Sequence, residues 1–449
     1  MYKKVLTIAL VMLWSNVQAE NAQNLLDIYQ LALSNDPVWA SARSGNLAAQ
    51  EKVAQGKALY LPTATFSTNA SHSDSDIRYI NNSVFRNGGR ESYETFGYGV
   101  NVSQPIFRMQ NYLQYQQSKI QVSQADKQLI LAQQDLILRT AQAYFDVLLA
   151  QDKIDLINAQ KSAISRQLEQ AQANFDVGTA TITDVNEAQA KFDLTTAQEI
   201  AAINDLEIKK RTIQSIIGQL PQALATAKAD IKTELPEPRA MQQWVEIAEQ
   251  NNLALNIQQE ALQIATKEVD RQNAGHLPTL DAVGNYNDTR AGGSPNGFGS
   301  DLQNTTIGLQ LQIPLYQGGA INSKVREAVA NKQKAQDDVE TARRKAELDT
   351  QQAYLNLTSS ISQVKAYEQA LISSQSQLDS TNLGYDVGVR NSVDVLNAQQ
   401  QLFSAKRDLL QSRYTYLLSA LKLKSASGLL NDLDLVSINQ QLVNAPTQP

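Results

Sequence analysis

The side chains that could do chemistry are few in this sequence, and their spacing does not form a catalytic set. The chain contains no cysteine and only two histidines, His72 and His276. This excludes a disulfide framework and a cysteine nucleophile, and it leaves little imidazole for acid–base catalysis or metal binding. Neighbouring acids such as Asp337 and Asp338 are typical of a solvated helix face. No nucleophile-elbow, phosphate-loop or metal-ligand spacing occurs, so we expect no enzyme activity, metal or cofactor.

Polar residues with an interpretable arrangement stand beside two similar turns. Residues 175–178 have the sequence FDVG, and residues 385–388 have the sequence YDVG. The glycine of each turn can adopt the left-handed conformation that ends a helix. Asp184 and Asp394 follow the turns, near the start of the next helix, where a carboxylate accepts hydrogen bonds from free N–H groups. Helix capping is therefore the simplest role for both aspartates.

The two turns belong to a pattern that occurs twice along the chain. Landmarks of the first half recur about 210 residues later: Leu61-Pro62-Thr63 as Leu277-Pro278-Thr279, Pro105 as Pro314, Gln142-Ala143-Tyr144 as Gln352-Ala353-Tyr354, and Gly218 as Gly428. The repeats of a solenoid are only about 20–50 residues long. We therefore predict a duplicated domain in which each copy contributes the same layers.

Apolar residues recur every seven positions over long stretches. One row begins at Leu129 and ends at Ala171, and another begins at Val395 and ends at Leu423. A heptad period sustained over many turns predicts long helices that supercoil on their neighbours. Helices of about 60–70 residues would be roughly 100 Å long, which exceeds the size of an ordinary globular domain.

Each copy also carries two strand signals. Residues 96–103 and 305–313 alternate large apolar side chains with small or polar ones, and a weaker alternation follows each Leu-Pro-Thr. These lengths suit membrane strands of about 9–11 residues, apolar outward and polar inward. Stretches rich in Gly, Asn, Ser and Asp, at 73–93 and 288–303, predict hairpin loops. Four strands cannot close a barrel, and an open edge is not viable in lipid, so membrane strands would require two or three copies of the chain.

The N-terminal segment resembles an export signal. Lys3 and Lys4 precede an apolar run at 5–14, and small residues surround Ala19. A transmembrane anchor is the alternative, but the run has about half of the roughly 20 residues that a spanning helix needs. We therefore expect cleavage after Ala19 and export. The net charge of -6 argues against a nucleic-acid partner, which needs a basic face.

From residue 20 to about residue 440, these features resemble the TolC-like outer-membrane factors, a family of outer membrane efflux proteins. The resemblance rests on the two Leu-Pro-Thr strand starts, both Val-Gly turns and the stretch IPLYQGG at 313–319. It implies a mainly α fold with a membrane β-barrel: a homotrimer in which a 12-stranded barrel in the outer membrane continues as a 12-helix α-barrel across the periplasm. A small equatorial domain would surround the middle.

The duplication and the resemblance together predict a signal peptide at 1–19, an equatorial linker at 219–243, and a C-terminal equatorial segment and tail at 429–449. The first repeat, 20–218, would contain a strand pair at about 62–105, a long helix at about 107–177 and a return helix at about 182–217. The second repeat, 244–428, would contain a strand pair at about 278–314, a long helix at about 317–386 and a return helix at about 392–426.

The resemblance also implies functional residues at the turns. In the family, links between neighbouring hairpins close the periplasmic end, and here Tyr385 and Arg390 would engage Asp184, with Thr183 also meeting Arg390. The narrowest inner ring would contain Asp394 and, as a departure from the family's second aspartate, Asn397. The tip residues that would meet an adaptor are Val177, Gly178, Thr179, Val387, Gly388 and Val389.

The function implied is an outer-membrane channel of tripartite efflux pumps and type I secretion systems, extending into the periplasm. It would be a passive duct for drugs, detergents or proteins, opened at its tip by docking to a periplasmic adaptor and an inner-membrane transporter. Outer-membrane lipid would surround the strands. The alternative is a non-channel coiled-coil rod, periplasmic or at the surface, which has no need of apolar strands.

Overall fold

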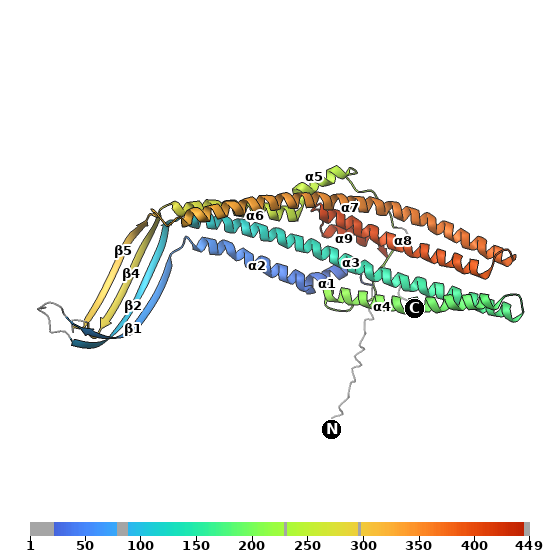
Figure 1. The fold of residues 1–449 in the computed structure, drawn as a ribbon, viewed down its shortest axis with the longest axis horizontal. Helices are drawn as coiled ribbons and strands as arrows, with labels where there is room; N and C mark the ends of the chain where they lie inside the picture. The colour runs from blue at the N-terminus through green and yellow to red at the C-terminus, as the bar shows by residue number, and fades with distance from the viewer. Residues whose placement is uncertain (1–21, 79–88, 229–230, 295–297, 444–449) are drawn as a thin grey trace, which may run out of the picture. The chain divides into compact units, whose positions relative to one another are not determined.

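The computed structural model describes residues 22–78, 89–228, 231–294 and 298–443 (Figure 1). The expected signal peptide lies outside them. The fold is mainly helical, as predicted. Packing divides the described residues into two compact units. The first takes the described residues up to 41, within 131–252 and from 346 onward, and the second takes those within 42–130 and 253–345. Each unit combines segments from both sequence repeats, so the compact units cut across the duplication.

Two helices of 68 and 67 residues have parts in both units. They are α3 (Met109–Asp176) and α7 (Ala320–Asp386), and each turns into a return helix, α4 (Ile182–Ile217) or α8 (Ser392–Ala426). The other elements of the first unit are α1 (Leu25–Asn35), β3 (Thr226–Ala227), α5 (Met241–Asn251), α9 (Asp432–Asn439) and β6 (Leu442–Val443). The second unit contains most of α2 (Pro37–Ala58), together with α6 (Leu253–Asn273), η1 (Ala274–His276) and the strands β1 (Thr63–Ile77), β2 (Gly89–Phe107), β4 (Thr279–Ala291) and β5 (Ser300–Gln312).

The heptad rows explain how the long helices pack. Six of the seven positions from Leu129 to Ala171 are buried, and so are all five from Val395 to Leu423. At the centre of the first unit, the rings of Tyr144 and Tyr414 both pack on Phe145 at 5.6 Å between centroids. This core joins α3 to the return helix of the other repeat. Among the described residues, no helix is long and apolar enough to cross a membrane.

The sheet of the second unit has the strand order β1-β2-β4-β5, antiparallel throughout. Directly paired residues share a face, so the register from Phe66 to Val100 to Tyr286 defines one row of side chains. That face exposes large apolar residues, namely Phe66, Phe96, Tyr98, Val100, Val102, Ile307, Leu309 and Leu311. The opposite face carries small uncharged polar residues, among them Thr65, Ser67, Asn101, Asn285 and Thr306. The predicted alternation is present.

Two expected loops are shorter than predicted. We expected loops at 73–93 and 288–303, but β1 and β2 continue through much of the first range, and β4 and β5 enter the second. The expectation is wrong because a polar composition does not by itself end a strand. Paired side chains extend the hairpins instead: Arg90 Nε lies 2.9 Å from Asp74 Oδ1, and Arg290 Nε lies 3.3 Å from Asp301 Oδ2. Residues 79–88 and 295–297 lie outside the described residues.

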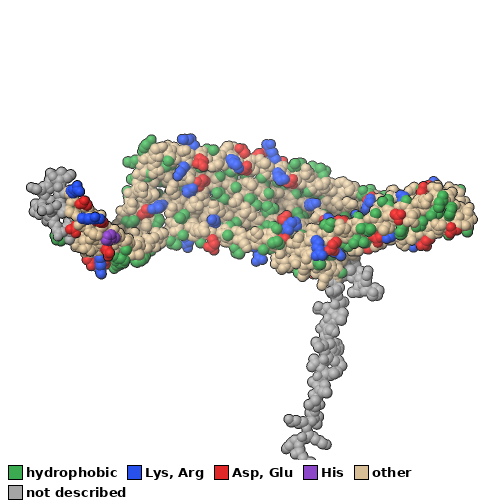
Figure 2. All heavy atoms as spheres, turned by 60° about the horizontal axis from the view of Figure 1, so that its bottom comes forward, with side chains coloured by type: hydrophobic (Ala, Val, Ile, Leu, Met, Phe, Trp, Pro, Cys, Tyr) green, Lys and Arg blue, Asp and Glu red, His purple; other side chains and the backbone are tan. Residues whose placement is uncertain are grey.

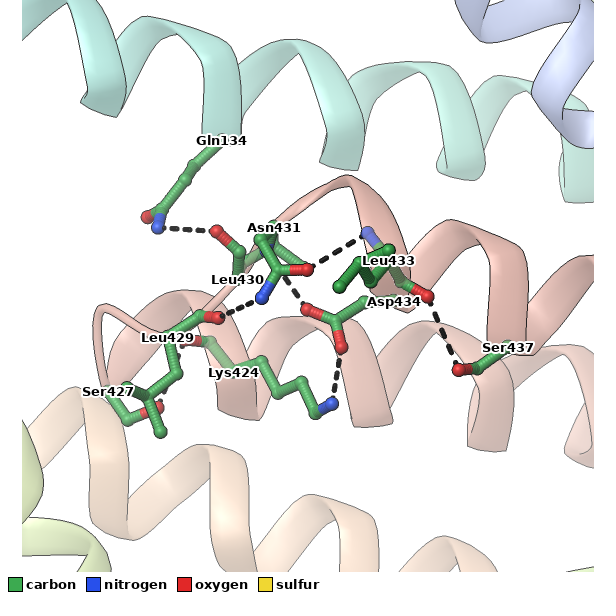
Figure 3. A network of polar contacts seen from close by, with 9 residues as sticks. All are labelled: Gln134, Lys424, Ser427, Leu429, Leu430, Asn431, Leu433, Asp434 and Ser437. Atoms are coloured by element: carbon green, nitrogen blue, oxygen red, sulfur yellow. Dashed lines mark hydrogen bonds and ion pairs between the residues drawn. The ribbon is translucent and has the colours of Figure 1, made fainter.

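The return helices end at equivalent glycines, both with φ +78°. Gly218 lies against Asn35 at the end of α1, and Gly428 lies against Asn251 at the end of α5. After Gly428, Asn431 caps α9, and Lys424 forms an ion pair with the buried Asp434 (Figure 3). The α3 residue Gln134 reaches the same junction by donating to the Leu430 carbonyl at 2.9 Å. These contacts fix α8 and α9 on α3 within the first unit.

Candidate functional site at the helical tips

The first tip turn, between α3 and α4, is closed by its own backbone. The Asn174 carbonyl accepts from the Thr179 N–H at 2.8 Å and from the Thr179 hydroxyl at 3.0 Å. Gly178 has φ +79°, the left-handed conformation that glycine adopts without strain. Val177 projects into solvent with 74% exposure. The predicted tip residues therefore form one exposed turn with an apolar side chain at its end.

The second tip turn, between α7 and α8, has the same backbone design. The Gly384 carbonyl accepts from the N–H groups of Val389 and Arg390 at 2.8 and 3.0 Å. Gly388 has φ +77°, and Val387 and Val389 are 66% and 75% exposed. Both turns therefore present apolar side chains to solvent.

Asp184 acts as a helix cap in the single chain. Its carboxylate accepts from the N–H and hydroxyl of Thr181 at 2.9 and 2.8 Å, and the Thr181 hydroxyl accepts from the Asp184 N–H in return. Thr183 stands exposed on the first turn of α4. The capping role anticipated from the sequence is therefore present on α4.

Tyr385 and Arg390 have other partners than those inferred from the family. The Tyr385 hydroxyl accepts from Asn174 Nδ2 at 3.1 Å. The exposed Arg390 guanidinium lies 3.9 Å from the Asp394 carboxylate, one turn along α8. Within the described residues of one chain, no hydrogen bond or ion pair links Asp184 to Tyr385 or Arg390.

Asp394 and Asn397 lie together at the start of α8. Asp394 forms a capping box with Asn391, whose side chain accepts from the Asp394 N–H at 2.8 Å. Both ring candidates line a groove of about 650 Å³ between α7 and α8, together with Arg390. The other lining residues are neutral: Ser373, Ser374, Gln377, Ser380, Thr381, Ala398 and Gln401. The groove thus combines one carboxylate and one guanidinium with hydroxyl and amide groups.

Side-chain hydrogen bonds join the two hairpins within the chain, and sequence reasoning missed them. Besides the Asn174–Tyr385 bond, Gln167 Nε2 donates to Ser392 Oγ at 3.1 Å, and Lys191 Nζ donates to Gln400 Oε1 at 2.8 Å. Farther from the tip, the Tyr414 hydroxyl donates to Asp152 at 2.6 Å, and burial raises the pKa of this carboxyl. The seven-residue spacing of Gln167 and Asn174 was the available signal.

The histidines and acids form no metal centre among the described residues. His72 Nε2 lies 3.1 Å from Ser92 Oγ, and His276 Nε2 lies 3.2 Å from Asn322 Oδ1. On the face of the molecule in Figure 2, basic and acidic side chains are interspersed and do not gather into a patch of one sign. Nothing on that face resembles a phosphate-binding surface.

The two long helical hairpins and the four-stranded sheet define the fold, and comparison with known proteins gives the family. The model of the outer membrane efflux protein family matches residues 28–219 and 244–429. The chain belongs to this family, whose members are outer-membrane transport channels and not enzymes. The prediction of an outer-membrane channel for efflux and type I secretion is thereby confirmed.

Individual relatives resemble the chain over nearly its full length. The outer membrane protein TolC of Vibrio cholerae is 35% identical over 423 residues, which cover 94% of each chain. TolC of Escherichia coli is 34% identical over 455 residues, covering 98% of this chain and 89% of the relative. PrtF, a proteases secretion protein of Dickeya chrysanthemi, is 28% identical over 453 residues, covering 99% and 96%.

Solved channel structures share the fold. The outer membrane protein VceC of Vibrio cholerae gives a TM-score of 0.74 at 19% identity, over 90% of this chain and 96% of that one. The transmembrane channel CusC gives 0.76 at 17% identity, over 90% and 92%. Identities this low support the fold alone.

Proposed function

We propose that three copies of the chain form a passive export duct. Twelve strands would close a barrel in the outer membrane, and twelve helices would form an α-barrel across the periplasm. The observation that carries this proposal is the four-stranded sheet. One face exposes large apolar residues, the opposite face carries mostly small polar residues, and the edge strands β1 and β5 each pair on one side only among the described residues. In lipid such edges must pair, and the smallest membrane barrels have about eight strands.

The proposed cargo follows from the chemistry of the duct. The inner face of the strands carries Thr, Ser, Asn and Gly, which hold water without binding one class of solute. Drugs, detergents and proteins would therefore pass the same strands. The relatives named for proteases secretion and alkaline protease secretion support a protein cargo among these. Choice of cargo would belong to the transporter.

The proposed partners are a periplasmic adaptor and an inner-membrane transporter. The exposed valines of both turns, Val177, Val387 and Val389, supply apolar surface at the tips. The left-handed glycines, Gly178 and Gly388, close each turn tightly at the end of its hairpin. We infer that Gly178, Thr179 and Gly388 belong to the same contact, because they complete the two turns.

The proposed gate lies at these tips. In a closed trimer, Tyr385 and Arg390 of one hairpin would engage Thr183 and Asp184 of a neighbouring hairpin. The supporting observation is that the Arg390 side chain is 60% exposed and that, among the described residues, its one ion-pair partner is Asp394 at 3.9 Å. Its donors are therefore available to a neighbour. Exposed ion pairs contribute about 0–1 kcal/mol each. Several around a trimer would hold the tip shut and still release it on docking.

The gate is tested by the double variant Arg390→Ala, Tyr385→Phe in planar lipid bilayers. Loss of the links should raise single-channel conductance severalfold, because the tip is the proposed constriction. Arg211→Ala is the matched control, since Arg211 is an exposed α4 arginine paired with Glu207. A double variant that conducts like the wild type would remove these residues from the gate.

A further inference from the structure

One stripe of α3 is polar and faces the second hairpin. Lys153, Gln160, Gln167 and Asn174 are spaced by seven residues, so they lie on one side of the helix. The first two line a groove with Phe403 of α8. The last two donate amide hydrogen bonds to hydroxyls of the second hairpin, on Ser392 and Tyr385, at 3.1 Å in both cases. This stripe is the polar seam between the hairpins of one chain.

We propose that Asn174 is the positioning residue that holds Tyr385 in the closed tip within one protomer. The Gln167–Ser392 hydrogen bond supports the same contact between the two hairpins, seven residues farther from the turn. The proposal rests on the gate described above and adds a partner to it. The Asp184 carboxylate accepts both the N–H and the hydroxyl of Thr181, whereas the Asn174 amide reaches Tyr385 directly.

The duplication explains why Asn174 has this role. Asn174 and Gly384 hold the same place in their turns, since each carbonyl accepts two N–H groups from the far side of the turn. Their side chains have diverged. Asn174 reaches across to the other hairpin, whereas Gly384 leaves space that the Arg390 side chain fills. A Cβ at position 384 would lie 2.7 Å from Arg390 Cγ. The side chain at position 174 therefore holds Tyr385, and the lack of a side chain at position 384 makes room for Arg390.

The Asn174–Tyr385 hydrogen bond differs chemically from the ion pairs of the gate. An amide donating to a phenol carries no net charge, so salt screens it little, whereas exposed ion pairs weaken as ionic strength rises. Asn174 therefore supplies a part of closure that persists at high salt, and Arg390 supplies a part that does not.

The test is Asn174→Ala in the full-length protein, measured as open probability in planar bilayers at low and high KCl. Loss of one hydrogen bond should raise open probability about fivefold, because such a bond shifts an equilibrium by roughly that factor. The increase should be similar at both salt concentrations. Tyr385→Phe removes the same bond from the other side, so combining it with Asn174→Ala should add little. Asn382→Ala, at an exposed α7 asparagine, should behave like the wild type.

Two results would overturn the proposal. One is that Asn174→Ala leaves the open probability at the wild-type value while Tyr385→Phe raises it. The other is that the effects of Asn174→Ala and Tyr385→Phe on the free energy of opening add in full in the double variant, because two substitutions that remove the same hydrogen bond should not be additive. If Arg390→Ala and Tyr385→Phe also leave the channel unchanged, the gate itself is misplaced. If Asn174→Ala alone leaves the open probability unchanged, the gate residues are correctly placed and Asn174 has no part in the gate.

Discussion

Asp36 is the buried carboxylate that joins α1 and α2 to α3. Only 2% of its side chain is exposed, and Arg139 contacts it through two nitrogens at 2.9 and 3.2 Å. It also accepts from the Trp39 N–H at 2.7 Å, as the cap of α2. Burial alone would raise its pKa, but the hydrogen bonds from Arg139 and Trp39 outweigh burial and lower the pKa.

We predict that Asp36→Asn destabilises the protein by about 2 kcal/mol at pH 7, because the cap persists and the partly buried ion pair is lost. Since the folded pKa is lowered, the contribution of Asp36 is complete above the ordinary carboxyl pKa of about 3.9. It is lost as pH falls through the lower folded pKa. Thermal unfolding in detergent at pH 7 and in acid should show the two proteins converging below pH 4.

Asp135→Asn is the control for this pair, because Asp135 is the exposed second partner of Arg139. Its effect should stay below about 0.5 kcal/mol. A gap between wild type and Asp36→Asn that persists unchanged in acid would mean that the carboxylate charge is not what stabilises this junction.

Asn397 is the position where the proposed inner ring departs from the family. With Asp394 alone, three protomers would supply three carboxylates, and a ring of like charges attracts cations. We predict that Asn397→Asp strengthens block of the open channel by divalent and trivalent cations, measured as the blocking concentration in bilayers. Asn186→Asp adds a charge at an exposed site on α4 and should change block little. Equal block before and after Asn397→Asp would argue against the ring.

Residue roles were only partly predictable from sequence. The capping roles of Asp184 and Asp394 follow from their distance to a turn and are present. The Asn174–Tyr385 bond joins residues 211 positions apart, and no local pattern specifies such a pair. Asp36 and Arg139 were missed for the same reason, because one charge on each of two separate helices is ordinary in a sequence.

At the scale of elements, the two helix-terminal glycines provide a matched comparison. A Cβ at Gly428 would lie 2.1 Å from the Asn251 carbonyl oxygen, whereas a Cβ at Gly218 would meet its nearest atom, Asn35 Cβ, at 3.4 Å. Both glycines have φ +78°, so the left-handed strain of an alanine, about 1–2 kcal/mol, is common to both.

We predict that Gly428→Ala is the more destabilising substitution by at least about 2 kcal/mol, because α5 must also move away from α8. The melting temperatures of the two purified variants check this directly. If Gly428→Ala does not accumulate, its steady-state amount beside that of Gly218→Ala gives the same ranking. Equal stability of the two variants would show that the close approach of Asn251 relaxes without cost.

Helices were easier to predict than strands. A heptad row constrains a helix over its whole length, and the structure has return helices at Ile182–Ile217 and Ser392–Ala426. Strand ends follow from cross-strand pairs such as Arg290 with Asp301, which no single segment reveals. The polar ends of β1 and β2 were therefore mistaken for loop.

For the whole molecule, the sequence predicted a duplication but not the compact units. Each unit takes matching segments from both copies, because the long helices α3 and α7 belong partly to each. Residue contacts across the copies, such as that between Phe145 and Tyr414, fasten the first unit. The repeat is thus visible in the sequence, whereas each compact unit of the structure is built from segments of both repeats.

We predict that the protein purified from outer membranes contains three chains, measured by light scattering with correction for detergent. Its gel mobility should change on heating in SDS, as the closed strands separate. A particle of two chains would contradict the proposed twelve-stranded barrel. Recovery only from the soluble periplasm would favour the coiled-coil rod over the channel.

The two one-sided edge strands, β1 and β5, also bear on how such a protein reaches its membrane. Among the described residues, a single chain has two rows of unpaired backbone groups at these edges, which hydrocarbon would penalise. Insertion of a single chain is therefore unfavourable in free energy. Entry into the bilayer must then await encounter with sister chains. With three chains in each barrel, as proposed, the rate of biogenesis should fall steeply as synthesis falls, since the chains must meet before any of them can insert.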